Sequence, residues 1–412
     1  MMNIFQQLPN NLKVRLLISF VQNTAVTSVF PFMTLLLSKL IGSKKAGMIL
    51  IIGVVFKFIS ALIGGHISDS LKYKRFFSAM ITLFSSMMFL GMGICLYFME
   101  NLKDVLLVLF VMVYLTNEIC MALNKPIYNA FALDNVTEEN RSAYSKMKYW
   151  TSNISITLGM ALGGLFYANY KIELFLFITM ALLINTIILL VFIKESPRNV
   201  HALERHFWER LFKNYKTASQ NKPFVYLLFS GILILSAEMS LSSYISVRLG
   251  KNFHTLMFDG FNIDGIRMLS ILMMMNTFII TLFSFMILKL FSKMKPVSIL
   301  KFAFLFYTCG YTIVMSNNHI VTLVIFMFLA TVGEILFSPT FESEKIKVIP
   351  ENQRGSHSAL DGLVLTCAEF IARLYLIIGT VLPPLGMSVI VFAVVSIGFS
   401  LLLFTVKRQA AI

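Results

Sequence analysis

The chain has 412 residues, of which 57% are hydrophobic and only 13% are charged, and its formal net charge is +15. A soluble domain carries about 25% charged residues, so this composition excludes an ordinary water-soluble globule and places the chain in a lipid bilayer. The Lys and Arg residues gather in short clusters between long apolar runs, a pattern that indicates membrane topology and excludes a nucleic-acid partner.

Twelve apolar segments are long enough to cross a bilayer as helices. A hydrocarbon core of about 30 Å needs about 20 helical residues. In chain order the segments are 14–37, 46–68, 76–98, 104–125, 149–168, 172–194, 224–246, 267–291, 297–315, 319–341, 356–379 and 384–406. None of them alternates between polar and apolar residues as a barrel strand does. The sequence therefore predicts an all-α membrane protein with twelve transmembrane helices.

The basic residues on the connections predict an orientation and a domain plan. Most Lys and Arg outside the spans lie on the side that carries the two chain ends, so both termini are expected in the cytoplasm, with the protein in the cell membrane. The longest basic connection, 195–223, separates an expected six-helix bundle over 1–194 from a second over 224–412. Apolar residues recur at helical spacing from Leu203 to Tyr215, which predicts an amphipathic helix on the membrane surface.

A plan of six plus six helices is typical of secondary transporters, whose substrate site lies near the bilayer midplane. The sequence has no G-x-x-x-x-G-K-[ST] nucleotide loop, no H-E-x-x-H zinc motif and no histidine cluster. Transport driven by an ion gradient is therefore expected, with no cofactor, no metal and no enzymatic activity. The expected partners are protons, a small-molecule substrate and the lipid bilayer, and the transporter is expected to be a monomer.

Ionisable side chains inside the predicted spans are the candidates for proton coupling or substrate binding, because each costs about 2.5–3.5 kcal/mol to insert. They are Lys57, Glu118, Lys125, Glu238, Glu334, Glu369 and Arg373. Glu369 and Arg373 stand four residues apart on one helix, so a structural ion pair is the favoured interpretation there. Lys57 is expected to reach an acidic residue on another helix of its own half.

Glu334 is the strongest candidate of this group. An apolar environment favours the neutral form of a carboxyl group, so this residue could bind and release a proton. Its charged form could attract a cationic substrate, and protonation would remove that attraction. Glu238 is the second candidate. Lys57, Lys125, Lys148 and Arg373 instead favour an anionic or zwitterionic substrate, and both alternatives stay open at this point.

The stretch GHISDSLKYKR after the second span resembles the loop signature of the major facilitator superfamily, G-x-x-x-D-R-x-G-R-K. Gly65, Asp69 and Lys74 match it. The other signature positions carry Ser70, Lys72 and Tyr73. A small residue allows close helix approach, and cationic partners can hold an Asp at a helix end. The resemblance therefore implies a conformational latch formed by Gly65, Asp69 and Lys74.

Three further segments resemble the LmrP-type proton-coupled multidrug exporters of this superfamily. They are the seventh-to-eighth connection from Phe253 to Leu269, the stretch GEILFSP from Gly333 to Pro339, and Tyr149-Trp150 with Asn153 and Gly159. Gly159, Gly163 and Gly164 are also similar to a reduced glycine-rich antiporter motif, although ordinary helix packing explains them equally well. The likeness runs from about residue 4 to residue 406.

The chain departs from that subfamily at several acidic positions. Lys148 replaces an acidic residue at the entry to the fifth span, and Ser242 replaces an Asp in the seventh, one turn after Glu238. No acidic residue occurs in 384–406, so only Glu334 keeps its place. The resemblance implies two pseudo-symmetric six-helix bundles and proton-coupled efflux of small amphipathic or drug-like compounds by alternating access. The alternative is proton-coupled transport of an anionic or zwitterionic metabolite or a peptide-like solute.

Overall fold

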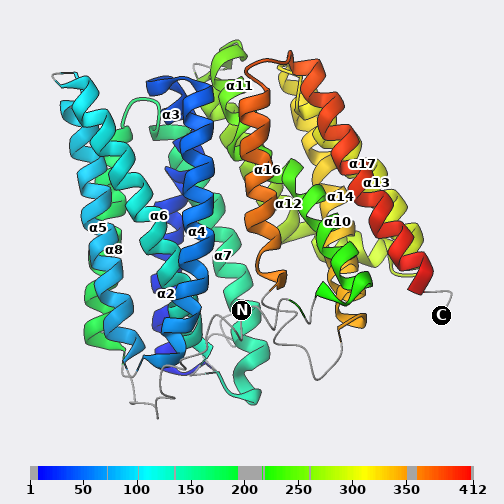
Figure 1. The fold of residues 1–412 in the computed structure, drawn as a ribbon, viewed down its shortest axis with the longest axis horizontal. Coiled ribbons are helices and arrows are strands. Elements are labelled where there is room, and N and C mark those ends of the chain that lie inside the picture. The colour runs from blue at the N-terminus through cyan, green and yellow to red at the C-terminus, as the bar shows by residue number, and fades with distance from the viewer. Residues whose placement is uncertain are drawn as a thin grey trace. The chain divides into compact units, whose positions relative to one another are not determined.

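The computed structural model is almost entirely helical (Figure 1). It describes residues 8–71, 73–100, 102–133, 136–193, 216, 219–258, 261–349 and 360–409. The amphipathic helix predicted within 195–223 lies outside these residues. Two compact units can be distinguished, one formed by Met1–Met33 with Ile52–Arg205 and the other by Thr34–Ile51 with His206–Ile412.

The first unit consists of long antiparallel helices. They are α2 (Asn10–Thr27), the 3-10 helix η1 (Phe30–Phe32), most of α4 (Ser43–Ser70), α5 (Lys74–Phe98), α6 (Lys103–Leu133), α7 (Glu138–Phe166) and α8 (Lys171–Phe192). Helix α5 packs against α6 and α8, and α2 packs against α7 and α8. A capping box starts α7, in which the Thr137 backbone N–H donates to Asn140 Oδ1 at 3.0 Å.

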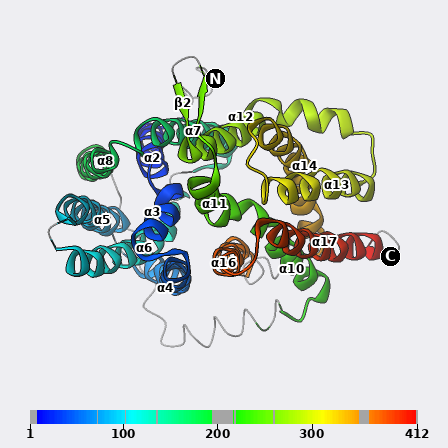
Figure 2. The same cartoon turned by 90° about the horizontal axis from the view of Figure 1, so that it is seen from above.

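The second unit contains the remaining helices and one short hairpin. The elements are α3 (Met33–Ile41), the start of α4, α10 (Lys222–Met239), the 3-10 helix η2 (Ser240–Ser242), α11 (Tyr244–Asn252), β1 (Leu256–Phe258), β2 (Phe261–Ile263), α12 (Gly265–Phe291), α13 (Pro296–Val314), α14 (Ile320–Lys347), α16 (Val364–Ile378) and α17 (Pro384–Gln409). Strands β1 and β2 are antiparallel, with Leu256 opposite Ile263, and the hairpin extends away from the helices (Figure 2). The side chain of Asp264 caps α12 by accepting from the Arg267 backbone N–H at 2.9 Å.

Every predicted span has a helical counterpart. Ten of the described helices are long and apolar enough to cross a membrane, counting α2 to α3 and α10 to α11 as one span each. The other two predicted spans, 149–168 and 356–379, correspond to α7 and α16. Helix α16 runs from Val364 to Ile378, so the described residues 360–363 of the predicted span lie outside this helix.

Two spans are interrupted at corresponding positions in the two halves. The first span breaks between α2 and α3, where Pro31 has no backbone N–H to continue the helical ladder. The seventh breaks at η2, where the Ser240 hydroxyl donates back to the Ala237 carbonyl at 2.5 Å, a type of bond that bends helices. Discontinuous helices in corresponding positions mark the substrate region of many transporters.

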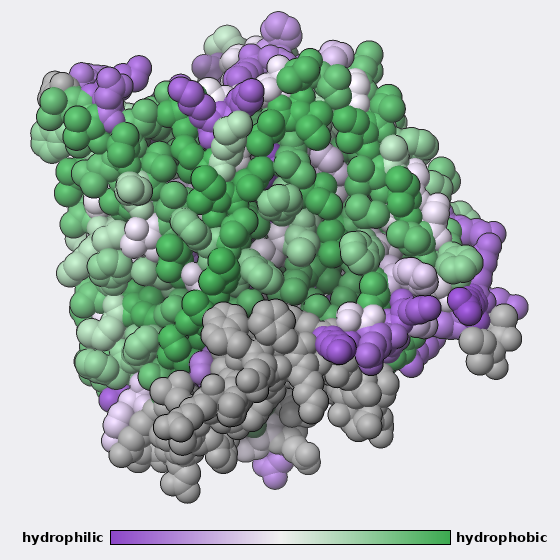
Figure 3. All heavy atoms as spheres, in the orientation of Figure 1, coloured by the Kyte–Doolittle hydropathy of each residue, from purple (hydrophilic) through white to green (hydrophobic). Residues whose placement is uncertain are grey.

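The exposed sides of the helices are mostly apolar (Figure 3). Large side chains such as Val191 on α8, Phe285 on α12 and Leu385 on α17 are exposed. A soluble monomer rarely exposes apolar patches of this extent, so these surfaces face lipid. The protein is a multi-pass membrane protein.

Candidate functional site

Two carboxyl groups of the second unit form the centre of the candidate site. Glu238 lies in the last turn of α10, directly before the break at η2, and Glu334 lies in the middle of α14. Both are half-buried, and they are close enough for their charges to interact. Asn276 on α12 donates from Nδ2 to Glu334 Oε2 at 2.8 Å and to Thr331 Oγ1 at 3.2 Å. Three helices thus converge on the pair.

Two tyrosines of α13 complete this cluster. Tyr307 and Tyr311 are buried, with ring centroids 4.6 Å apart, and both hydroxyls interact electrostatically with Glu238 and Glu334. The Tyr307 hydroxyl donates to the Ile234 carbonyl at 3.0 Å. The Tyr311 hydroxyl is buried and has no hydrogen-bond partner among the described residues. Such a hydroxyl is available to a ligand held by the carboxylates.

Glycine packing sets the position of Glu334. A methyl group at Gly333 would overlap the Tyr307 backbone, and one at Gly310 would overlap the Ala330 backbone. Only glycine at both positions lets α13 and α14 approach this closely. The close contact brings Glu334, which directly follows Gly333, next to the two tyrosines.

No basic side chain forms an ion pair with Glu238 or Glu334 in the part of the chain that the structure describes. Two carboxylates that share a poorly hydrated site resist being charged together, because burial and mutual repulsion both disfavour that state. A proton or a cationic ligand can remove the repulsion. The cluster can therefore exchange protons for positive charge.

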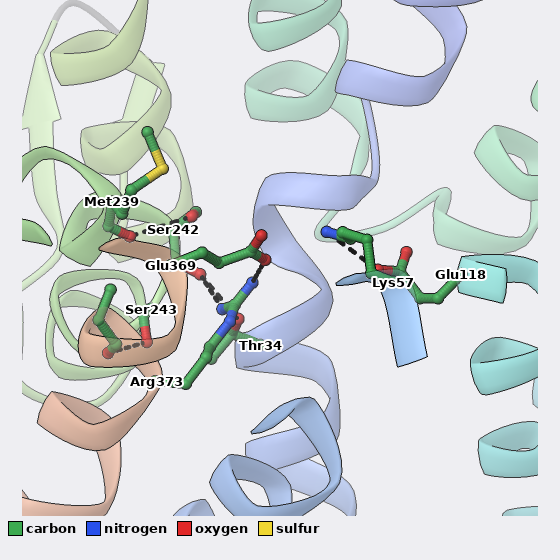
Figure 4. Close-up of polar contacts among 9 residues, drawn as sticks. Thr34, Lys57, Glu118, Met239, Ser242, Ser243, Glu369 and Arg373 are labelled. Carbon is green, nitrogen blue, oxygen red and sulfur yellow. Dashed lines mark hydrogen bonds and ion pairs between the residues drawn. The ribbon is translucent and has the colours of Figure 1, made fainter. Parts of the chain in front are cut away.

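A second polar group surrounds Arg373 on α16 (Figure 4). Its Nη2 lies 3.1 Å from Glu369 Oε1, which confirms the predicted ion pair. Its Nη1 donates to Thr34 Oγ1 at 2.5 Å and to the Ser242 carbonyl at 3.1 Å, and the Thr34 hydroxyl donates to the same carbonyl at 2.7 Å. Arg373 thus joins α16 to α3 and to the break in the seventh span.

A third polar group lies within the first unit. Lys57 Nζ on α4 is 3.1 Å from Glu118 Oε2 on α6 (Figure 4). This pair confirms that Lys57 reaches an acidic residue of its own half. Only 5% of the Glu118 side chain is exposed, against 31% for Lys57, so Glu118 depends on Lys57 for charge compensation. Lys125 and Lys148 are exposed.

We expect Lys57→Gln to lower the free energy of unfolding by about 1–3 kcal/mol, because it leaves a buried carboxylate without its cation. The double variant Lys57→Gln/Glu118→Gln should regain most of this loss, since neither charge remains. Thermal unfolding of the purified protein in one detergent would measure both effects. Lys125→Gln, at an exposed position of α6, is the matched control and should change little. A double variant less stable than Lys57→Gln alone would refute the pairing.

The predicted latch residues lie at the α4–α5 connection. Gly65 and Asp69 are in the last two turns of α4, and Lys74 begins α5 and is buried. Gly65 makes no close helix contact among the described residues, because a methyl group there would meet none of their atoms within 4 Å. The close approach is at Gly64, which packs on the Leu123 backbone of α6. Successive helical residues point about 100° apart, so only one of the two glycines can face α6.

The Asp69 side chain lies outside what the structure describes, and the latch itself stays a prediction. Sequence reasoning also missed four residues of the carboxylate cluster, namely Asn276, Tyr307, Tyr311 and Thr331. Asn276 could have been selected from the sequence, because an amide inside an apolar span is costly and needs a hydrogen-bond partner. The two tyrosines could not have been selected in this way, because aromatic residues are common in every span of this chain.

Comparison with known proteins agrees with this architecture. Residues 15–372 match the sequence profile described as Major Facilitator Superfamily. A Na(+), Li(+), K(+)/H(+) antiporter of Planococcus maritimus is 26% identical over 385 residues, which cover 88% of each chain. Two crystal structures of POT family transporters, one in complex with 5-aminolevulinic acid and one with a thioalcohol-conjugated peptide, match with TM-scores of 0.72 and 0.74. They are 14% and 15% identical and cover 98% of this chain and 99% of their own.

At sequence identities this low, the structural similarity shows a common fold and nothing about substrate. The two structural matches confirm the predicted twelve-helix fold. The chain is a membrane transporter, not an enzyme, and it belongs to the Major Facilitator Superfamily.

Proposed function

We propose that the protein is a proton-coupled antiporter that exports cationic compounds by alternating access, with Glu238 and Glu334 as the exchange site. One observation carries this proposal, namely two interacting carboxylates without a basic partner in the described part of the chain. The cluster is stable when protonated and stable when a cation is bound, but costly when empty and charged. The site therefore changes its access from one side of the membrane to the other only with protons or a cation bound. This requirement couples proton movement to cation movement.

Small amphipathic or drug-like cations are the substrate class that we favour. The stretch from Gly333 to Pro339 carries the resemblance to the LmrP-type exporters, and it includes one of the two carboxylates. The alternative anionic or zwitterionic substrate has less support, because the basic residues that suggested it are either paired with an acidic residue or exposed. Lys57 and Arg373 have acidic partners, and Lys125 and Lys148 are exposed.

An alkali cation is the second candidate substrate. The groups around the pair are oxygen donors, namely Glu238, Glu334, the free Tyr311 hydroxyl and the Thr331 hydroxyl. Carboxylate and neutral oxygens are the ligands that hard cations prefer. The Planococcus maritimus relative is named as an antiporter of Na(+), Li(+) and K(+), which agrees with this candidate.

Proton release from inverted membrane vesicles tests the proposal. We expect a lipophilic cation such as tetraphenylphosphonium to collapse an imposed pH gradient in wild-type vesicles, and Glu238→Gln to slow this response at least about tenfold, since one charge of the site is lost. The matched control Glu173→Gln, at an exposed residue of α8, should respond like wild type.

The choice of added solute separates the candidates. A response to NaCl, LiCl or KCl alone, again reduced by Glu238→Gln, would identify the alkali-cation exchanger. Proton movement caused only by a zwitterionic dipeptide would overturn the cation proposal and support the alternative substrate class.

A further inference from the structure

A cavity of about 580 Å³ lies at the end of the second unit where α3 gives way to α4. Its lining residues come from α3, α4, α11, α16, α17 and the α3–α4 and α16–α17 connections, and they belong to this unit alone. Four of them are basic, namely Lys44, Lys45, Arg248 and Lys251. No acidic residue is among the described side chains that line it. The cavity is therefore a strongly positive site without an internal counter-charge.

Arg248 is the buried base of this cavity. Its Nη1 donates to the Asn317 carbonyl at 2.6 Å and to Asn318 Oδ1, and its Nη2 donates to the Val314 carbonyl at 2.9 Å. All three partners are neutral. The Arg248 Nε is buried and has no hydrogen-bond partner in the described part of the chain. A buried guanidinium without an anion is unfavourable unless an anion binds nearby.

The three lysines also have no anionic partner among the described residues. Lys251 Nζ donates to the Ser43 hydroxyl at 2.8 Å. Lys44 and Lys45 are exposed, and the described residues offer them no ion pair. Both lie in the first turn of α4, which contains no acidic residue. Cations are disfavoured at a helix N-terminus, where free backbone N–H groups already attract anions. A bound anion would neutralise the lysine charges and would also accept from the free N–H groups of the helix N-terminus.

The cavity also has an apolar side that points to the kind of anion. Ile41, Leu376 and Leu382 line it. Val381 and Leu385, the chain neighbours of the lining residues Leu382 and Pro384, have exposed fractions of 83% and 74%. Apolar residues this exposed on a membrane protein face acyl chains. A ligand that satisfies both sides carries a phosphate on a hydrocarbon body.

We propose that this cavity binds the phosphate group of an anionic phospholipid, with the acyl chains lying along Val381 and Leu385. The phosphate would contact Lys44, Lys45 and Lys251 and approach the first N–H groups of α4. The site is separate from the Glu238–Glu334 cluster in residues and in charge, so it does not depend on the identity of the transported solute. Free inorganic phosphate shares the same headgroup chemistry and is the competing source.

Native mass spectrometry of the purified protein with phosphatidylglycerol tests the proposal. We expect Lys44→Gln/Lys45→Gln to bind phosphatidylglycerol about tenfold more weakly than wild type, because two charges near the headgroup are removed. Phosphatidylcholine, which has no net charge, should bind equally to both proteins. Lys103→Gln/Lys171→Gln is the matched control, since these lysines also begin helices, but Asp104 and Glu173 in the same turns balance them.

Each other outcome overturns the assignment. Equal loss of phosphatidylglycerol from both double variants would show a general charge effect in place of a site. Inorganic phosphate that stabilises wild type against heat and displaces phosphatidylglycerol at equal concentration would identify a free-phosphate site. If the double variant gives no folded protein, Lys251→Gln alone must show the same selective loss, and unchanged binding in it would refute the proposal.

Discussion

Replacing Glu334 with Gln is expected to abolish coupled exchange, with an apparent affinity for a cationic substrate lowered about 30-fold or more. The loss of one partner from a desolvated charge interaction typically costs about 2 kcal/mol or more. The Gln side chain keeps the size of Glu334, and its amide oxygen can still accept from Asn276 Nδ2, as the carboxylate does at 2.8 Å. The variant therefore changes charge and proton binding and little else.

Substrate-induced proton release in inverted vesicles, together with binding of the same cation to purified protein, measures this effect. Glu342→Gln is the matched control. It lies on the same helix and makes the same chemical change, and its partner Lys345 keeps Asp361 at 2.6 Å. The control should exchange protons like wild type. If Glu334→Gln remains active while Glu334→Ala is inactive, charge cycling at this residue is excluded and Glu334 has a packing role.

Glu334 and Glu238 could be selected from the sequence because the cost of an ionisable group in lipid depends only on its place in a span. The proximity of the two residues could not be predicted from the sequence. It depends on how α10 and α14 pack, and that packing is set by glycines such as Gly333 and Gly310, whose contacts lie on another helix. The role of Tyr311 was unpredictable for the same reason. Its hydroxyl, which has no partner among the described residues, gains a meaning only when the positions of the two carboxylates are known.

The spans themselves were predictable because each is a long, local apolar pattern. The breaks within the first and seventh spans were not predicted, although Pro31 and the serines around Ser242 are the residues that interrupt the helical ladder. Hydropathy averages over such positions, since Pro and Ser in an apolar window lower its mean only slightly. The predicted span 356–379 also begins before α16, which starts at Val364, although Asp361 and Gly362 lie in that stretch.

Gly64→Ala and Gly65→Ala are expected to affect stability in opposite directions, although the two residues are adjacent on α4. A methyl group at Gly64 would overlap the Leu123 backbone, whereas one at Gly65 would meet no atom of the described residues within 4 Å. A backbone cannot move aside as a flexible side chain can, so Gly64→Ala should cost about 1–3 kcal/mol or more. Gly65→Ala should gain up to about 1 kcal/mol, because Ala favours the helix more than Gly does.

Thermal unfolding of the two variants in the same detergent measures the difference, and each serves as the control for the other. Equal destabilisation would mean that α4 contacts α6 through both residues, contrary to the structure. The same pair also tests the predicted latch. If Gly65→Ala is as stable as wild type yet transports more slowly, the open space beside Gly65 must be filled during the transport cycle. If it transports normally, the latch can involve only Asp69 and Lys74, and Gly64 provides the glycine contact between the helices.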